Sequence, residues 1–272
     1  MKDRTLTDKY SVLKHALRSE RKVAIAFSGG VDSSFLLYAA HDALGDDAVA
    51  ITAVSPFVPK REIEEAADFC KEYGIRQITF EHDITSIEGL ADNPPKRCYF
   101  CKKAIMGKMK SICEDEGLFS LCDGTNKDDE GGYRPGIDAL SELGIKSPLR
   151  EFGFTKSEIR ELSKVLGLPG WDKPAYACLA TRIPYGERLD ETKLKLVEKA
   201  EDYLMGLGFK ELRVRVHETV IARIEVNPND FKKIMRPDIR LEINQAFKQM
   251  GFAFITLDMQ GYRSGSMDEG IM

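Results

Sequence analysis

The 272-residue sequence lacks a hydrophobic run long enough to cross a bilayer, and its first residues contain no apolar leader segment. A transmembrane helix needs about 20 mostly apolar residues in a row, and a secretory signal needs an apolar stretch of roughly 7–15 residues. We therefore expect a cytoplasmic protein with no membrane partner. A basic excess is also missing, because the formal net charge is −4. Proteins that bind nucleic acid nonspecifically normally carry such an excess, so we expect no nucleic-acid partner.

Internal repeats and low-complexity segments are absent as well. The chain is instead 43% hydrophobic, which is ample for the cores of one large or two modest globular domains. Its six cysteines would stay reduced in the cytoplasm. Close pairs of cysteines are therefore more typical of metal or catalytic sites than of disulfides.

A glycine-rich stretch at residues 27–34, FSGGVDSS, follows an apolar run and precedes a helical pattern. This order predicts a strand, a tight turn and the start of a helix. Glycine lets the backbone approach an anion closely, and a helix N-terminus presents unpaired N–H groups and a positive dipole. The stretch therefore predicts a phosphate site, although an ordinary glycine turn is the simpler alternative.

The stretch is neither a Walker loop nor a dinucleotide fingerprint, because it has no closing Lys-Ser/Thr pair and no G-x-G-x-x-G pattern. It resembles the pyrophosphatase loop, Ser-Gly-Gly-x-Asp-Ser, of ATPases that adenylate a substrate and release pyrophosphate. Asp32 then resembles the carboxylate on the magnesium side of that loop. We therefore predict that the loop binds ATP and Mg²⁺ through Ser28, Gly29, Gly30, Asp32 and Ser33.

Apolar runs alternate with helical patterns over the first 170 residues. Short unbroken runs at residues 48–54, 75–80 and 118–121 are typical of buried strands. Strand, helix and strand in repetition predict a parallel, Rossmann-like α/β sheet with right-handed crossovers. Ligands bind beyond the carboxyl ends of such strands, so we add Ser55, Gly124 and Thr125 to the expected ATP site.

A segment rich in proline and glycine, residues 171–188, predicts a connector between domains. Residues 1–170 would then form the ATP pyrophosphatase domain, and residues 189–272 a smaller α+β domain for substrate binding or oligomerisation. On a predicted strand of this second domain, Arg213, Arg215 and His217 share one face. We expect the tail from Gly261 to be frayed.

Two of the cysteines, Cys98 and Cys101, form a C-x-x-C placed between Pro94-Pro95 and a predicted helix, where two thiolates can point at one metal. Cys178, inside the connector, is the third candidate ligand. The alternative for the pair is half of a structural zinc site, but no second pair of ligands completes it. The other three cysteines fall on helix or strand positions and are expected to be buried: Cys70, Cys113 and Cys122.

Taken together, these motifs resemble the LarE family of ATP-dependent sulfur transferases over nearly the whole chain. The resemblance rests on residues 28–33, 123–126, 133–136, 178–186 and 213–217, and the block CLATRIPYG at 178–186 is the most family-specific. It implies that the enzyme adenylates a carboxylate of pyridinium-3,5-biscarboxylic acid mononucleotide and converts it to a thiocarboxylate, in the synthesis of the nickel-pincer nucleotide cofactor. It also suggests a homo-oligomer.

The resemblance further implies a source of sulfur. Some members of the family carry only the equivalent of Cys178, which gives up its own sulfur and becomes dehydroalanine. Because this sequence also has Cys98 and Cys101, it is similar to the branch in which three thiolates hold a 4Fe-4S cluster that carries an extra sulfide. A sulfide donor would then act as a partner, and the sacrificial route remains the alternative.

The substrate implied by the family is an anionic nucleotide, so its phosphate needs cations outside the ATP loop. Arg182, Arg213 and Arg215 are the candidates, because guanidinium groups suit phosphate oxygens. The alternative for the strand arginines is a solvated face that pairs with nearby acids. Separately, Glu201 and Glu225 resemble acidic positions around the substrate site in the family.

Other functions stay open for the same motifs. A family that thiolates tRNA bases also joins a pyrophosphatase loop to a three-cysteine iron-sulfur site. Amide-forming ligases of the NAD synthetase or GMP synthetase type share the loop but give the cysteines no role. A nucleotide sensor that reports metal status would bind ATP without releasing pyrophosphate.

Overall fold

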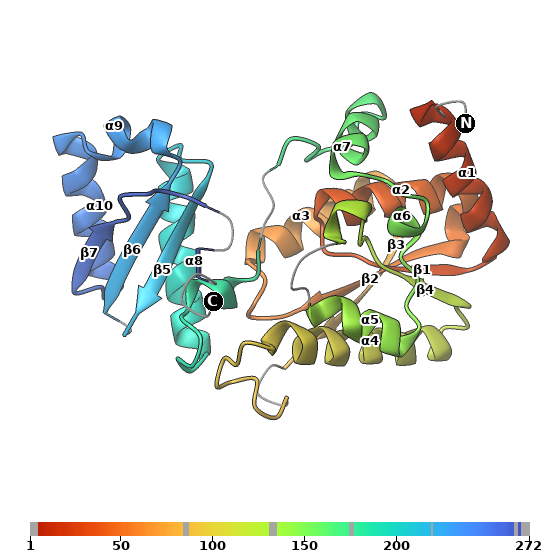
Figure 1. The fold of residues 1–272 in the computed structure, drawn as a ribbon, viewed down its shortest axis with the longest axis horizontal. Helices are drawn as coiled ribbons and strands as arrows, with labels where there is room; N and C mark the ends of the chain where they lie inside the picture. The colour runs from red at the N-terminus through yellow and green to blue at the C-terminus, as the bar shows by residue number, and fades with distance from the viewer. Residues whose placement is uncertain are drawn as a thin grey trace. The chain divides into compact units, whose positions relative to one another are not determined.

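The computed structural model describes residues 5–83, 87–130, 135–173, 177–218, 220–263 and 266–267. The chain forms two compact units (Figure 1). One unit comprises Met1–Ile87 with Lys96–Tyr176, and the other comprises Glu88–Pro95 with Ala177–Met272. A short excursion at residues 88–95 therefore belongs with the C-terminal part of the chain. In the described part of the chain, no helix is long and apolar enough to span a membrane.

The first unit contains a four-stranded sheet in the order β3-β2-β1-β4. Its strands are β1 (Val23–Ala26), β2 (Ala48–Val54), β3 (Arg76–Glu81) and β4 (Ser120–Cys122). Every neighbouring pair is parallel, which confirms the predicted α/β class. The helices are α1 (Leu6–Ser19), α2 (Val31–Leu44), α3 (Lys60–Glu72), α4 (Arg97–Asp115), α5 (Pro135–Leu143), α6 (Pro148–Glu151) and α7 (Lys156–Val165).

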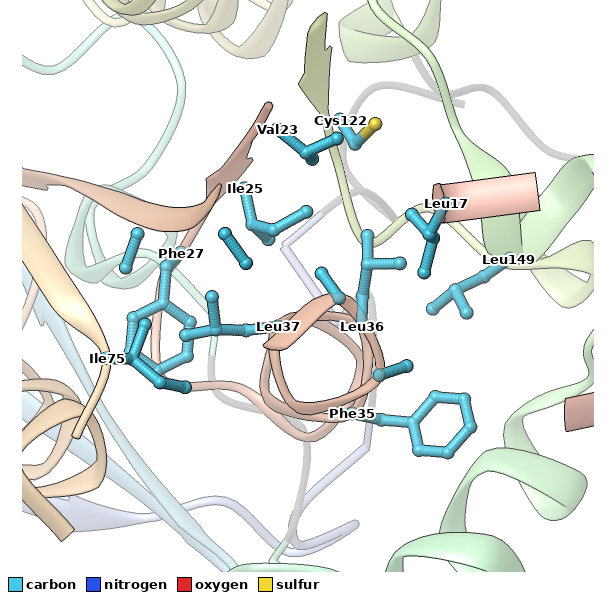
Figure 2. Packing of buried hydrophobic residues seen from close by; sticks show 14 of the residues in the cluster. Leu17, Val23, Ile25, Phe27, Phe35, Leu36, Leu37, Ile75, Cys122 and Leu149 are labelled. Carbon is cyan, nitrogen blue, oxygen red and sulfur yellow. The ribbon is translucent and has the colours of Figure 1, made fainter. Parts of the chain in front are cut away.

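The strands β1, β2 and β4 are mostly buried, as in most parallel sheets, whereas the edge strand β3 is partly exposed. Alternate residues of β1 enter different cores, since successive side chains on a strand point to opposite faces. Ile25 packs with Leu36 and Leu37 of α2 in the core shown in Figure 2. Ala24 belongs to a second core that also contains Met109 of α4. The sheet therefore holds the loop after β1 on a rigid support.

The second unit is a small α+β domain. Its sheet has the order β5-β6-β7, with β5 (Leu212–His217) antiparallel to β6 (Ile221–Val226) and β7 (Phe254–Leu257) parallel to β6. The helices of this unit are α8 (Glu191–Gly206), α9 (Phe231–Ile234) and α10 (Pro237–Met250). The fold class expected from the sequence is thus confirmed for this unit too.

The C-x-x-C differs in local structure from our expectation. We expected the C-x-x-C to lie between Pro94-Pro95 and the start of a helix. Helix α4 instead begins at Arg97, so Cys98 and Cys101 both lie in its first turns. Residues three apart on a helix lie on the same side. Helix α5 was not predicted at all, and the motif residues Tyr133 and Arg134 just before it lie outside the described part of the chain.

Candidate functional site

The loop after β1 has the geometry of a phosphate cradle. Gly29 has a φ of 73°, and a Cβ there would lie 3.3 Å from the carbonyl oxygen of Glu62, so glycine is required at this position. Gly30 is the N-cap residue of α2. The Ser33 hydroxyl donates to the Gly30 carbonyl at 3.0 Å, which closes the turn. The first N–H groups of α2 therefore begin directly after the glycines, where an anion would bind.

Asp32 lies in the first turn of α2 and is poised for a cation. Its Oδ2 pairs with the Nζ of Lys156 at 2.5 Å. Its Oδ1 is buried and accepts no hydrogen bond from the described residues. Burial raises the pKa of this carboxyl, and the nearby Lys156 only partly offsets that effect. A buried carboxylate oxygen without a partner fits a Mg²⁺ ligand, since Mg²⁺ prefers oxygen.

Lys156 is a site residue that the motif analysis missed. It opens α7, whose first turn has a capping box of Thr155 and Glu158 that follows the Thr-x-x-Glu pattern of the sequence, and its backbone N–H donates to Asp128 at 2.8 Å. The helix start thus fixes a lysine next to the loop carboxylate. The sequence signal was available, because the capping box located the helix start, but nothing in the spacing linked residue 156 to residue 32.

The loop after β4 approaches the start of α2 closely. A Cβ on Gly124 would lie 2.9 Å from the backbone nitrogen of Ser33, a distance that backbone atoms do not tolerate. Next to it, Asp123 is buried and accepts from Thr125 at 2.6 Å and from Ser147 at 2.7 Å. The loops after β1 and β4 therefore lie together, as expected for strands that are neighbours in the sheet.

Ser55 follows β2, which is the other neighbour of β1. It is buried, and its hydroxyl accepts from the backbone N–H of Phe57 at 3.2 Å. The Thr125 hydroxyl is likewise engaged within the protein, because it donates to the Asp123 carboxylate. The ATP contacts of Ser55 and Thr125 stay predictions.

The six cysteines fall into two groups. Cys70, Cys113 and Cys122 are buried, as expected. Burial raises the pKa of Cys70 and Cys122 to about 12 and that of Cys113 to about 11, so these thiols stay protonated. Cys98 and Cys178 are exposed and Cys101 is half-buried. Reactive or ligating thiols need such access.

The candidate ligand cysteines belong to different units, with Cys98 and Cys101 in the first and Cys178 in the second. The Sγ of Cys101 lies 4.0 Å from Nε2 of His82, which follows β3. Within the residues that the structure describes, no three His, Cys, Asp or Glu side chains are grouped to hold a metal. The cluster therefore stays a prediction.

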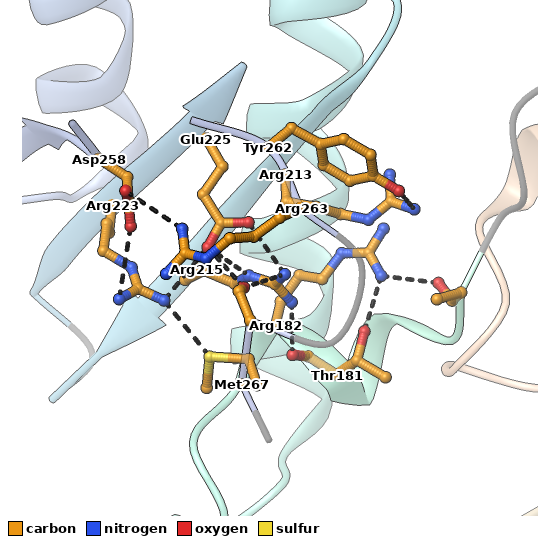
Figure 3. A network of polar contacts seen from close by, with 12 residues as sticks. Thr181, Arg182, Arg213, Arg215, Arg223, Glu225, Asp258, Tyr262, Arg263 and Met267 are labelled. Atoms are coloured by element: carbon orange, nitrogen blue, oxygen red, sulfur yellow. Dashed lines mark hydrogen bonds and ion pairs between the residues drawn. The ribbon is translucent and has the colours of Figure 1, made fainter. Parts of the chain in front are cut away.

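A buried network of charged groups fills one side of the second unit (Figure 3). Arg215 of β5 forms a bidentate pair with Glu225 of β6, at 3.1 and 2.9 Å. Arg213 is also buried, and its guanidinium lies over the ring of Tyr262 at 5.0 Å. Burial and the neighbouring Arg182 lower the pKa of Arg213. The strand face of Arg213 and Arg215 is thus buried and not solvated, although Arg215 does pair with a nearby acid as that alternative expected.

Arg182 connects this network to Cys178. Its Nε and one terminal nitrogen donate to Glu201 of α8 at 2.8 and 3.0 Å. The other terminal nitrogen donates to the carbonyls of Ala177 and Cys178 and to the hydroxyl of Thr181, at 2.7, 3.2 and 2.8 Å. Arg182 therefore holds the turn that carries the cysteine. A contact between Arg182 and the substrate phosphate stays a prediction.

Comparisons with known proteins show which families this chain is similar to. A model of the NAD synthase family matches residues 7–96. The pyridinium-3,5-bisthiocarboxylic acid mononucleotide synthase of Lactiplantibacillus plantarum is 35% identical over 97% of this chain and 95% of its own. An uncharacterized Synechocystis protein, slr1717, is 42% identical over 91% of this chain and 92% of its own. One component of the glutamine-hydrolyzing GMP synthase of Saccharolobus solfataricus is 28% identical over 70% of this chain and 56% of its own.

The relative from Lactiplantibacillus aligns with both units, and its 35% identity is high enough to place the two chains in one family. The N-terminal match to NAD synthase covers the strand, glycine loop and helix that form the phosphate cradle. This chain therefore belongs to the LarE family, and it is an ATP-dependent sulfur transferase with a pyrophosphatase loop.

Proposed function

We propose that this enzyme converts a carboxylate of pyridinium-3,5-biscarboxylic acid mononucleotide to a thiocarboxylate, as a step toward the nickel-pincer nucleotide cofactor. One observation carries the proposal: the turn of Cys178 and the arginine face belong to one network. Arg215 donates to the Thr181 carbonyl at 2.8 Å, and Arg182 donates to the Cys178 carbonyl. A sulfur-bearing residue and the buried cations that we assign to the nucleotide phosphate thereby belong to the same unit.

The first step is adenylation at the glycine loop. The substrate carboxylate attacks the α-phosphorus of ATP, and pyrophosphate leaves with the electrons of the broken P–O bond. The start of α2 and Lys156 would bind the phosphates, and Oδ1 of Asp32 would bind Mg²⁺, which supplies charge neutralisation when bound. The chemistry needs this step because a carboxylate oxygen leaves poorly until it carries AMP.

The second step replaces AMP with sulfur. A sulfur nucleophile attacks the acyl carbon, and AMP leaves with the electrons of the C–O bond. We assign Cys98, Cys101 and Cys178 as ligands of a 4Fe-4S cluster, which supplies a transferable sulfide when bound. Three accessible thiols, two of them one helical turn apart, are the donor type that such clusters use. Sulfide from a donor would restore the cluster after each turnover.

The alternative route uses the sulfur of Cys178 itself. Its sulfur attacks the acyl carbon and AMP leaves. The Cβ–S bond then breaks as the Cα proton is lost, which gives the thiocarboxylate and dehydroalanine at position 178. This route allows one turnover per chain, whereas the cluster route allows many.

The substrate phosphate is assigned to Arg213 and Arg215. Three guanidinium groups, those of Arg182, Arg213 and Arg215, are buried near one another in this unit. Guanidinium groups suit phosphate oxygens, and burial strengthens their hydrogen bonds to an anion. The enzyme is expected to be a cytoplasmic homo-oligomer with no nucleic-acid partner.

The test combines product analysis with protein mass spectrometry under anaerobic conditions. Protein with ATP, Mg²⁺, substrate and sulfide should release pyrophosphate and form more than one thiocarboxylate per chain, while Cys178 keeps its mass. Cys98→Ala, Cys101→Ala and Cys178→Ala should lose iron and activity together, and Cys113→Ala is the matched control that should keep both. If Cys178 loses the mass of hydrogen sulfide in step with product while Cys98→Ala stays active, the sacrificial route is correct. Pyrophosphate release without any thiocarboxylate would refute the proposal.

A further inference from the structure

The described residues of the C-terminal segment, 258–263 and 266–267, are built into the second unit. The expectation of a frayed tail from Gly261 is wrong for the described residues. The backbone N–H of Asp258 donates to the Ile224 carbonyl, and that of Tyr262 donates to the Val226 carbonyl, both at 2.8 Å. Gly261 has a φ of 75°, and a Cβ there would lie 2.6 Å from the Val226 oxygen. The chain therefore turns tightly against the end of β6, and only glycine permits the turn.

Side chains of this segment contact the two strand arginines (Figure 3). The Arg213 guanidinium lies over the Tyr262 ring at 5.0 Å, and its terminal nitrogen lies 3.5 Å from the Tyr262 hydroxyl. A cation over an aromatic face is attracted by the ring, more strongly where water is excluded. Tyr262 therefore fixes the plane of the Arg213 guanidinium.

Ser266 performs the corresponding role for Arg215. Its hydroxyl accepts from Arg215 at 2.9 Å and donates to Oε1 of Glu225 at 2.9 Å. The side chain is buried, with 6% exposure. One hydroxyl thus uses both its donor and its acceptor capacity to connect the arginine to its carboxylate. Arg215 and Glu225 are held in one geometry as a result.

We infer that Tyr262 and Ser266 are positioning residues for substrate binding, acting through Arg213 and Arg215. The inference rests on the proposed role of these arginines in binding the substrate phosphate. Guanidinium groups bind phosphate best when their planes are fixed in advance, because less side-chain freedom is lost on binding. The C-terminal segment completes the phosphate site although Tyr262 lies 49 residues after Arg213 in the sequence.

The experiment measures the Kd of the biscarboxylic mononucleotide without ATP, and then the KM and kcat of complete turnover. Tyr262→Leu and Ser266→Ala should each weaken nucleotide binding about tenfold and raise its KM, with kcat and the KM of ATP unchanged. Tyr262→Phe, which keeps the ring, and Ser266→Thr, which keeps the hydroxyl, should bind within about twofold of the parent. Tyr203→Leu is the control, since Tyr203 pairs with exposed Glu242 in the same unit.

The outcomes separate the inference from the function on which it rests. If the Arg213→Ala, Arg215→Ala double variant loses nucleotide binding but Tyr262→Leu and Ser266→Ala do not, only the positioning role is wrong. Nucleotide binding by the double variant equal to that of the parent would overturn both the phosphate assignment and the inference. An equal loss in Tyr203→Leu, or a fall in kcat with unchanged KM, would show a general effect on folding and would also overturn the inference.

Discussion

Replacing Glu201 by Gln tests the buried pair that anchors Cys178. Glu201 and Arg182 each have 1% side-chain exposure. Both Glu201 oxygens accept from Arg182, and Oε1 also accepts from the Val214 N–H at 3.0 Å. Burial opposes ionisation of Glu201, but Arg182 and Arg213 outweigh it and lower the pKa of the carboxyl. Glutamine would leave the arginine charge buried and place an NH₂ donor against it. Removing one partner of a buried pair costs about 3–5 kcal/mol.

Urea unfolding followed by a probe in the second unit provides the assay. With an m-value of roughly 2 kcal/mol/M, the midpoint of Glu201→Gln should fall by about 2 M. The control is Lys195→Gln on the same helix. Its pair with Glu191 is 63% and 60% exposed, so the cost should stay below about 1 kcal/mol. Replacing both partners, as Arg182→Met with Glu201→Leu, should recover part of the loss because no charge remains unpaired. A midpoint for Glu201→Gln equal to that of the parent would refute the reasoning.

Three further predictions concern the phosphate loop and the cysteines. Asp32→Asn should abolish pyrophosphate release yet raise the urea midpoint at pH 7. The pKa of Asp32 is raised in the folded protein, so its ionised form lowers the folding stability at pH values above its ordinary pKa. The difference in midpoint between the variant and the parent should therefore shrink as the pH falls toward about 4. An unchanged or lower midpoint at pH 7 would contradict this. Gly124→Ala should cost about 1–3 kcal/mol and weaken ATP binding, because the new Cβ meets the Ser33 backbone; calorimetry with ATP measures the second effect, and parental affinity would disprove it. Iodoacetamide at pH 8 should alkylate Cys98 and Cys178 while leaving Cys70 and Cys122 unmodified, as peptide mass mapping would show, and early modification of Cys122 would contradict its burial.

The first unit could be predicted well from local sequence. Short apolar runs correctly located parallel strands, and the loop at residues 28–33 located the turn before α2. The expectation that the run at residues 75–80 is buried was wrong, because β3 lies at the edge of the sheet and is partly exposed. These features depend on neighbours in sequence, where periodicity and turn chemistry act directly. Lys156 shows the limit: it lies 124 residues from Asp32 in the sequence, and only the packing of α7 near α2 brings the two together.

The arginine network exposes a different limit. Alternation on a strand correctly placed Arg213 and Arg215 on one face, but alternation cannot distinguish a solvated face from a buried one. That distinction depends on Glu225 across the hairpin and on Tyr262 and Ser266 from the end of the chain. The tail pattern looked irregular because its order comes from tertiary contacts rather than from periodicity.

Burial also changes what the arginines can do. A solvated arginine contributes little to affinity, because water competes for its donors and the side chain must be ordered on binding. In this unit Arg215 is 4% exposed and Arg213 is 6% exposed, and their orientations are fixed by protein contacts before any ligand arrives. The proposed phosphate site therefore rests less on the presence of two arginines than on their burial and fixed orientation, because less side-chain freedom is lost when a ligand binds groups that are already oriented.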